Sequence, residues 1–248
     1  MLEELGLVPQ WVLRSRRGDD HDRGTTPAEV PSAQPPAAPR TDASDSSAMP
    51  REARIAGMDW AQLKAAVREC TACRLHSART QTVFGVGDEA ADWLFIGEGP
   101  GAEEDARGEP FVGQAGRLLD NMLAAIGLKR GQDVYIANIV KCRPPGNRVP
   151  EPSEAGACDV FLRRQIALMR PRLLIALGKT AASNLLSSDA SIGSLRGRLH
   201  ECGGLPLIVT YHPAYLLRNL IDKAKAWEDL CFARETMERL KAQAPAQP

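Results

Sequence analysis

The chain has no apolar run that approaches the roughly 20 residues needed to cross a bilayer. It also lacks a basic-then-apolar leader, so residues 1–17 do not resemble a secretory signal. We therefore expect a cytoplasmic protein, a monomer with no membrane partner. In that reducing compartment the six cysteines are poor candidates for a disulfide framework. Metal ligation is the better interpretation if their spacing agrees.

Net charge is absent as well, because 31 basic residues balance 31 acidic ones. Residues 1–50 contain five arginines and eight acidic residues, which leaves 26 basic and 23 acidic residues in the remainder. That remainder is only mildly basic. An enzyme that turns over on DNA does not need the high charge of a tight binder, so charge neither establishes nor excludes a nucleic-acid partner.

Large apolar residues become scarce from residue 18, where Pro, Ala, Ser and Asp dominate. Such a segment cannot bury enough surface to offset its ordering entropy, so we predict a disordered linker over residues 18–57. Before it, residues 1–17 form a short amphipathic peptide that concentrates Leu2, Leu5, Leu7, Trp11 and Leu13. We expect a globular domain over residues 58–242 and a short tail at 243–248.

Four short apolar runs predict buried strands at residues 93–97, 134–140, 173–177 and 205–210. Segments of helical period lie before, between and after them, at residues 60–69, 115–126, 155–169, 180–186 and 224–240. Asp59 is the expected N-cap of the first helix. This alternation predicts an α/β fold, a three-layer αβα domain around a central, mostly parallel four-stranded sheet.

Polar residues follow the ends of these strands. Glu98 comes directly after the first run, Asn138 lies near the end of the second, and His212 follows the fourth. Ligands of open α/β sheets bind outside the carboxyl ends of the strands. An acid, an amide and an imidazole should therefore converge at one edge of the sheet.

Four cysteines have a spacing that suggests metal binding: Cys70, Cys73, Cys142 and Cys158. Four thiolates suffice for a tetrahedral zinc or for a 4Fe–4S cluster. Zinc ribbons usually show two tight CxxC pairs and only one is present here, while four buried apolar thiols are a third interpretation. We interpret Cys202 and Cys231 as ordinary thiols.

Four segments resemble motifs of the family 4 uracil-DNA glycosylases, in order: residues 97–105 (GEGPGAEED), 110–116 (PFVGQAG), 138–148 (NIVKCRPPGNR) and 212–218 (HPAYLLR). The cysteine pattern is similar to that family's 4Fe–4S ligand set. The resemblance covers about residues 65–240. It implies a uracil-DNA glycosylase fold and hydrolysis of the N-glycosidic bond of deoxyuridine in single- or double-stranded DNA, the first step of base excision repair.

Two related families fit less well. Family 5 enzymes have an apolar residue where this chain has Glu98. The X-type enzymes, which bind uracil covalently, carry an extra basic loop with a histidine, and this chain has no histidine between Gly116 and Cys142. Two functions of other classes also stay open. One is a cluster-bearing module that binds uracil or DNA without catalysis, and the other is a zinc-stabilised structural protein.

The resemblance implies catalytic roles for Glu98 and His212. Glu98 would lie beside the sugar, where it positions or activates water and its charge favours an oxocarbenium-like transition state. The alternative is an acid that caps the next helix, although Glu103, Glu104 and Asp105 are better placed for capping. His212 would donate to uracil O2 as negative charge develops there, and its alternative is a histidine that serves only a turn.

The resemblance also implies substrate contacts. Asn138 would form hydrogen bonds with the O4 and N3–H edge of uracil, because an amide can donate and accept at once. The alternative is that its side chain bonds to its own backbone. Phe111 would stack on the flipped ring, or belong to the core. Gly99 would permit close backbone approach.

DNA contacts are expected from the loops that follow the second and fourth strands. Arg143 and Arg148 would contact phosphates, or be solvated surface arginines. Tyr215, Leu216 and the neighbouring Leu217 would wedge into the gap left by the flipped base; alternatively the leucines begin a helix and face the core.

The N-terminal pattern LxxLGL…WxLR is similar to the N-terminal peptide of the psi subunit of the bacterial replicative polymerase, which docks on the clamp loader. A short apolar motif ahead of a flexible tether is typical of a peptide that folds on a partner. The alternative is a segment that packs on its own catalytic domain.

Overall fold

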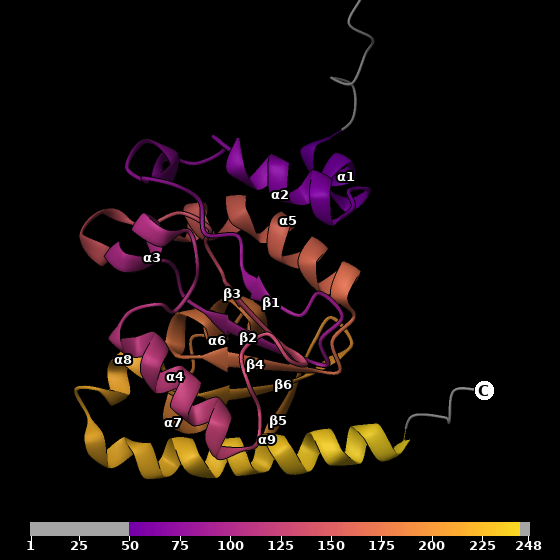
Figure 1. Ribbon diagram of the computed structural model, residues 1–248, viewed down its shortest axis with the longest axis vertical. Helices are drawn as coiled ribbons and strands as arrows, with labels where there is room; N and C mark the ends of the chain where they lie inside the picture. The colour runs from indigo at the N-terminus through magenta and orange to yellow at the C-terminus, as the bar shows by residue number, and fades with distance from the viewer. Residues whose placement is uncertain (1–49, 244–248) are drawn as a thin grey trace, which may run out of the picture. The chain divides into compact units, whose positions relative to one another are not determined.

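The computed structural model describes residues 50–243, so the predicted N-terminal peptide, most of the linker and most of the tail lie outside the described residues (Figure 1). The centre is a six-stranded sheet with the order β1-β3-β2-β4-β6-β5. Its strands are β1 (Val86–Gly87), β2 (Trp93–Gly97), β3 (Val134–Asn138), β4 (Leu173–Leu177), β5 (Leu199–Cys202) and β6 (Leu205–Thr210).

The four predicted strands are the four central ones, and they pair in parallel, which confirms the α/β prediction. The two antiparallel edge strands were not predicted. Strand β1 has only two residues, and β5 alternates exposed and half-buried positions, so neither contains an apolar run that the sequence could reveal.

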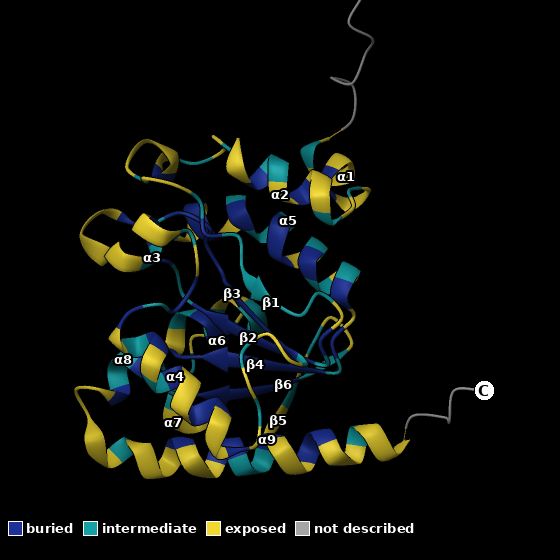
Figure 2. Ribbon diagram, in the orientation of Figure 1, coloured by how far each residue is buried: buried dark blue, intermediate teal, exposed yellow. Residues whose placement is uncertain are grey.

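Alternating strand residues divide the core into two layers. Leu94 and Ile96 of β2 face one layer, and Trp93 and Phe95 face the other. Helices α1 (Arg51–Ala56), α2 (Trp60–Arg68), α5 (Pro152–Met169), α6 (Lys179–Leu186) and α7 (Ile192–Leu195) contribute to the first layer. Helices α4 (Gln114–Ala125), α8 (Pro213–Leu216) and α9 (Lys223–Gln243) contribute to the second. Figure 2 shows the buried strands between these half-exposed helices.

The remaining helical segments lie in the loops that carry the polar motifs. They are α3 (Ala102–Arg107) and the 3-10 turns η1 (Arg74–Ser77), η2 (Pro145–Asn147) and η3 (Leu220–Asp222). Asp59 caps α2 as predicted, in a reciprocal arrangement with Gln62. No helix within residues 50–243 is long and apolar enough to cross a membrane.

Helix α1 corrects the predicted domain boundary, because it lies inside residues 18–57, which we predicted to be linker. Ile55 is 2% exposed and joins the core, and the Arg51 guanidinium donates to the carbonyl of Ala157 over 2.9 Å. A single buried apolar residue in six is too weak a pattern to reveal a helix from sequence. The globular domain therefore begins at about residue 50.

The sheet register places the polar motifs in one row. Gly97 pairs with Asn138, Ile96 with Ala176, and Leu177 with Thr210. Glu98, Gly178 and His212 follow these last paired residues within one or two positions. The carboxyl ends of the four parallel strands thus present their polar residues at the same edge.

Candidate active site

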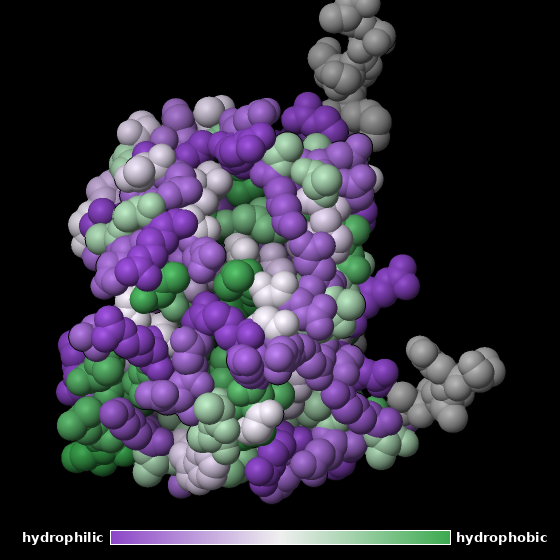
Figure 3. All heavy atoms as spheres, viewed as in Figure 1, coloured by the Kyte–Doolittle hydropathy of each residue, from purple (hydrophilic) through white to green (hydrophobic). Residues whose placement is uncertain are grey.

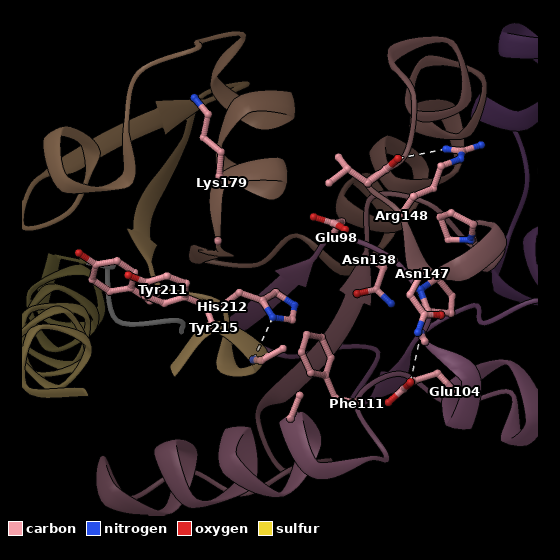
Figure 4. Close-up of a pocket in the computed structure, with 18 of the residues that line it drawn as sticks. Glu98, Glu104, Phe111, Asn138, Asn147, Arg148, Lys179, Tyr211, His212 and Tyr215 are labelled. Atoms are coloured by element: carbon pink, nitrogen blue, oxygen red, sulfur yellow. Dashed lines mark hydrogen bonds between the residues drawn. The ribbon is translucent and has the colours of Figure 1, made fainter. Parts of the chain in front are cut away.

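A pocket of about 730 Å³ lies at this edge. It brings together seven of the residues that the sequence analysis selected: Glu98, Gly99, Phe111, Asn138, Arg148, His212 and Tyr215. Figure 4 shows Glu98, Asn138, His212 and Phe111 around one space, although they come from four different loops and strand ends. The predicted convergence of an acid, an amide and an imidazole is therefore present.

Asn138 ends β3 and is 2% exposed. Its backbone carbonyl accepts from the Lys141 ammonium over 3.0 Å, which fixes the main chain. Its side-chain Oδ1 is buried and has no hydrogen-bond partner among the described residues. An unpaired buried acceptor of this kind is destabilising by about 1–3 kcal/mol, so its presence in a pocket indicates a ligand that donates a hydrogen.

Gly97 makes room for this amide. A Cβ at Gly97 would lie 2.5 Å from Asn138 Oδ1 and 2.6 Å from the Phe111 ring, which are distances that real Cβ atoms do not adopt. Only glycine therefore allows Asn138 and Phe111 to approach the end of β2 together.

His212 is the N-cap of α8, and its Nδ1 accepts from the backbone N–H of Ala214 over 3.1 Å. This bond leaves the ring proton on Nε2 in the neutral form. Burial, with a further contribution from the positive charge of Arg218, lowers the pKa of His212 to about 4. At neutral pH the imidazole is therefore an uncharged Nε2–H donor.

Phe111 has a φ of 56°, in the left-handed region that non-glycine residues rarely adopt. Its surroundings hold this conformation. Arg130 donates to the carbonyls of Pro110 and Phe111 over 2.9 and 2.8 Å, and a Cβ at Gly116 would lie only 1.8 Å from the Phe111 carbonyl oxygen. Strained backbone kept in this way is typical of functional sites. The Phe111 ring lies 5.4 Å from that of His212, tilted by 31°.

Glu98 follows β2 and is partly exposed to the pocket. One carboxylate oxygen, Oε2, accepts a hydrogen bond from the Thr180 hydroxyl. The capping role that was the alternative for Glu98 belongs to Glu104, whose carboxylate accepts from the N–H groups of Gly101, Val112 and Gly113 over 3.0–3.2 Å. The Glu98 carboxylate therefore does not serve as a helix cap and is available to a ligand in the pocket.

The loop after His212 corrects one predicted DNA contact. Leu216 is 1% exposed and packs in the core, so the prediction that it contacts DNA is wrong; a short helix turns its side chain inward. Leu217 is 40% exposed instead. Tyr215 lines the pocket, stacks on Tyr211 with ring centroids 5.2 Å apart, and donates to Asp222.

The two predicted phosphate-binding arginines lie in the loop after β3. Arg143 donates to Asn147 Oδ1 over 2.7 Å and does not line the pocket. Arg148 lines the pocket and forms a bidentate pair with Glu154, at 2.8 and 2.7 Å. Glu154 is 1% exposed, and the pair lowers the pKa of its carboxyl group. Arg148 therefore anchors this loop to α5, whatever else it binds.

The four predicted ligand cysteines line a second, separate cavity between α2, the loop after β3, and α5. N–H groups point at three of the sulfurs. Arg79 Nη1 lies 3.1 Å from Cys142 Sγ, the backbone nitrogen of Lys141 lies 3.3 Å from Cys158 Sγ, and Arg51 Nη2 lies 3.7 Å from Cys70 Sγ. Such donors stabilise thiolates rather than thiols. Burial alone would act the other way, since it raises the pKa of both Cys142 and Cys158.

The donor set fits a metal group held by four thiolates. A tetrahedral zinc requires four sulfurs about 2.3 Å from one point. A 4Fe–4S cluster spreads its four thiolates, because each binds a different iron. Four thiols line one cavity and N–H donors point at three of them, an arrangement that suits thiolates bound to a metal group.

Sequence reasoning missed three residues that support these sites. Thr180 comes three residues after the end of the third predicted strand. This closeness to the carboxyl end of a strand was the only sequence feature that could have indicated a role in the site. Lys141 lies within a recognised motif, but a lysine 1% exposed is not expected from sequence. Arg79 donates to Cys142 from a loop without a recognisable pattern.

This chain is similar to known proteins over most of its described residues. The sequence profile of the uracil DNA glycosylase superfamily matches residues 84–231. A type-4 uracil-DNA glycosylase of Thermotoga maritima is 50% identical over 155 residues, 62% of this chain and 80% of the relative. One from Archaeoglobus fulgidus is 45% identical over 159 residues, 61% of this chain and 79% of the relative.

A type-5 uracil-DNA glycosylase of Pyrobaculum aerophilum is less similar, with 31% identity over 149 residues, 54% of this chain and 66% of the relative. This chain belongs to the type-4 branch of the uracil DNA glycosylase superfamily.

Proposed function

We propose that this chain removes uracil from DNA by hydrolysing the N-glycosidic bond of deoxyuridine, which leaves an abasic site. The observation that carries this proposal is the buried Oδ1 of Asn138, which lies in the pocket and has no partner in the part of the chain that the structure describes. The N3–H of uracil supplies the hydrogen that this atom lacks, and uracil O4 can accept from the same amide. Cytosine presents the reverse pattern, with an acceptor at N3 and a donor at C4.

The neighbouring groups complete a site for a flat, polar base. The Phe111 ring offers a stacking face beside Asn138. The neutral His212 can donate from Nε2 to uracil O2. A neutral donor suits this place, because the hydrogen bond strengthens as negative charge develops on O2. The base must leave the helical stack to enter, as in other enzymes that act on a nucleobase.

Glu98 acts on the other side of the scissile bond. When the C1′–N1 bond breaks, its electron pair leaves with uracil and positive charge develops on the sugar. The Glu98 carboxylate stabilises that charge and orients a water, whose oxygen bonds to C1′. One water proton passes to the carboxylate or to solvent, and the uracil anion is reprotonated. Stabilisation of both charges at once lowers the barrier.

The pocket rim supports contact with the DNA strand. Arg148 and the nearby Arg143 would contact phosphates. The segment between α8 and α9 exposes Leu217, Leu220 and Ile221. Figure 3 shows an apolar area at the lower left, where α8 and the start of α9 lie in Figure 1. Leu217 and Tyr215 are the side chains of this loop that would fill the space of the flipped base.

The experiment that tests this function is release of uracil from a labelled oligonucleotide under single-turnover conditions. We expect the protein to release uracil and to leave cytosine and thymine in place. Asn138→Asp should lower the rate on uracil by on the order of 100-fold, because a carboxylate cannot donate to O4 and repels the developing anion. Asn121→Asp, on the exposed surface of α4, is the matched control and should cleave normally.

Two outcomes would contradict the proposal. Binding of uracil-containing DNA without release would identify a binding module instead of an enzyme. A wild-type rate for Asn138→Asp would show that the unpaired amide does not read the base.

We also propose that Cys70, Cys73, Cys142 and Cys158 hold a 4Fe–4S cluster. The cluster would join the end of α2 to the loop after β3, and so support the main chain that leads to Asn138. Its role here is structural, and the hydrolysis described above does not use it. The donors at Arg79, Arg51 and Lys141 support the assignment, because they would stabilise ligated thiolates.

Protein purified without oxygen should be brown, absorb near 400 nm and contain about four irons per chain, as a cubane with four thiolate ligands requires. Cys142→Ser should lower the iron content, whereas Cys202→Ser and Cys231→Ser should leave it intact. Stoichiometric zinc without iron would disprove the cluster.

Finally, we propose that residues 1–17, which lie outside the described residues, bind a replication partner of the clamp-loader type. Deletion of residues 1–49 should leave cleavage of a short oligonucleotide unchanged and abolish capture of purified clamp-loader proteins. Trp11→Ala should have the same effect, because a buried tryptophan is the expected anchor of such a contact. Retained capture after the deletion, or a large loss of thermal stability, would instead favour a peptide that packs on its own domain.

A further inference from the structure

Thr180 is joined to the proposed catalytic carboxylate from a different strand end. Its hydroxyl donates to Glu98 Oε2, although 82 positions separate the two residues in the chain. No other hydrogen bond to this carboxylate occurs within residues 50–243. We infer that Thr180 is a positioning residue that orients the Glu98 carboxylate toward the water it activates. This inference rests on the role proposed for Glu98.

The helix that carries Thr180 is held firmly at its beginning. Helix α6 starts directly after β4, and the N–H of Gly178 donates to the Thr210 carbonyl at the end of β6 over 2.8 Å. Lys179 lines the pocket, but its ammonium is directed away from Glu98 and donates to the carbonyls of Asp189 and Ala190. The Thr180 hydroxyl is therefore presented from a fixed backbone.

The same turn also contacts the second catalytic group. Gly178 has a φ of 88°, and a Cβ at this position would lie 2.7 Å from the Cβ of His212. The start of α6 thus lies against both Glu98 and His212. The Gly178 backbone packs against His212, and the Thr180 hydroxyl binds Glu98. The distance between the Glu98 carboxylate and the His212 ring therefore depends on this turn.

The hydroxyl is not needed by its own helix. Ser and Thr usually stabilise a helix start from the N-cap position, where the side chain accepts from backbone N–H groups. Here the N-cap is Gly178, and Thr180 is two residues inside the helix with its hydroxyl directed at Glu98. A partly exposed glutamate has several rotatable bonds, and one charge-assisted hydrogen bond at Oε2 restricts them while Oε1 stays available for water.

The test compares Thr180→Val, which keeps the shape and removes the hydroxyl, with Thr180→Ser, which keeps the hydroxyl. A hydrogen bond to a charged group contributes a factor of about 10–100 to an equilibrium constant, which is the expected loss in rate if the whole contribution acts in the transition state. We therefore expect Thr180→Val to lower the single-turnover rate of uracil release about 10- to 100-fold, with DNA affinity within about twofold of wild type. Thr180→Ser should recover the rate to within about threefold.

Two further variants separate the role of Thr180 from the role proposed for Glu98 and from the proposed activity. Ser183→Ala removes a buried hydroxyl from the same helix that has no hydrogen-bond partner within residues 50–243, so it should leave the rate unchanged. Glu98→Ala should be slow by itself, and adding Thr180→Val to it should produce no further loss. A wild-type rate for Glu98→Ala would overturn the role of Glu98 rather than the function of the protein.

Three results would overturn the positioning role. The first is a wild-type rate for Thr180→Val, and the second is a Thr180→Ser variant as slow as Thr180→Val. The third is a rate loss from Thr180→Val that is as large in the Glu98→Ala background as in the wild-type protein. Thermal unfolding of each variant reports whether the fold is retained. If Thr180→Val unfolds, the rate of the folded Thr180→Ser variant decides, since a loss of more than about tenfold there would contradict the inference.

Discussion

The close approach between the ends of β2 and β3 is the constraint on which the rest of the site depends. Gly97 and Asn138 are the last paired residues of these strands, and the space above Gly97 is occupied by the Asn138 amide and the Phe111 ring. Any side chain at Gly97 would displace one of them. The parallel register then fixes Glu98 one residue later and brings the start of α6 and His212 to the same edge.

This arrangement maintains polar groups that would be unfavourable elsewhere. An unpaired buried amide oxygen, a histidine kept neutral by burial and a phenylalanine with positive φ all occur within one pocket. The unpaired oxygen and the strained backbone cost stability in the empty protein, whereas the lowered pKa of His212 costs stability only as the pH falls below the ordinary value of 6.5. A bound uracil would offset the cost of the unpaired oxygen. The neighbouring structure compensates: Arg130 fixes the Phe111 backbone, Lys141 fixes that of Asn138, and the Ala214 N–H fixes the His212 ring. Such local conflicts are expected at functional sites.

The pattern of short apolar runs was sufficient to predict the sheet centre, because each run is a buried strand of five or six residues. The positions of Glu98, Asn138 and His212 followed from the rule for carboxyl ends of parallel strands. Contacts between distant segments could not be predicted in this way. The hydrogen bond from Thr180 to Glu98, the inward turn of Leu216 and the docking of α1 on α5 depend on tertiary packing that no local pattern encodes.

The central claim is that the pocket presents the hydrogen-bonding complement of uracil before the base arrives. The most direct test is the protonation state of His212, measured by nitrogen NMR on the protein without DNA. The account predicts a neutral ring with its proton on Nε2 from pH 8 down to pH 5, and protonation only as the pH approaches about 4, because burial lowers the pKa of this imidazole. A ring that becomes protonated near its ordinary pKa of 6.5, or that carries its neutral proton on Nδ1, would contradict the account.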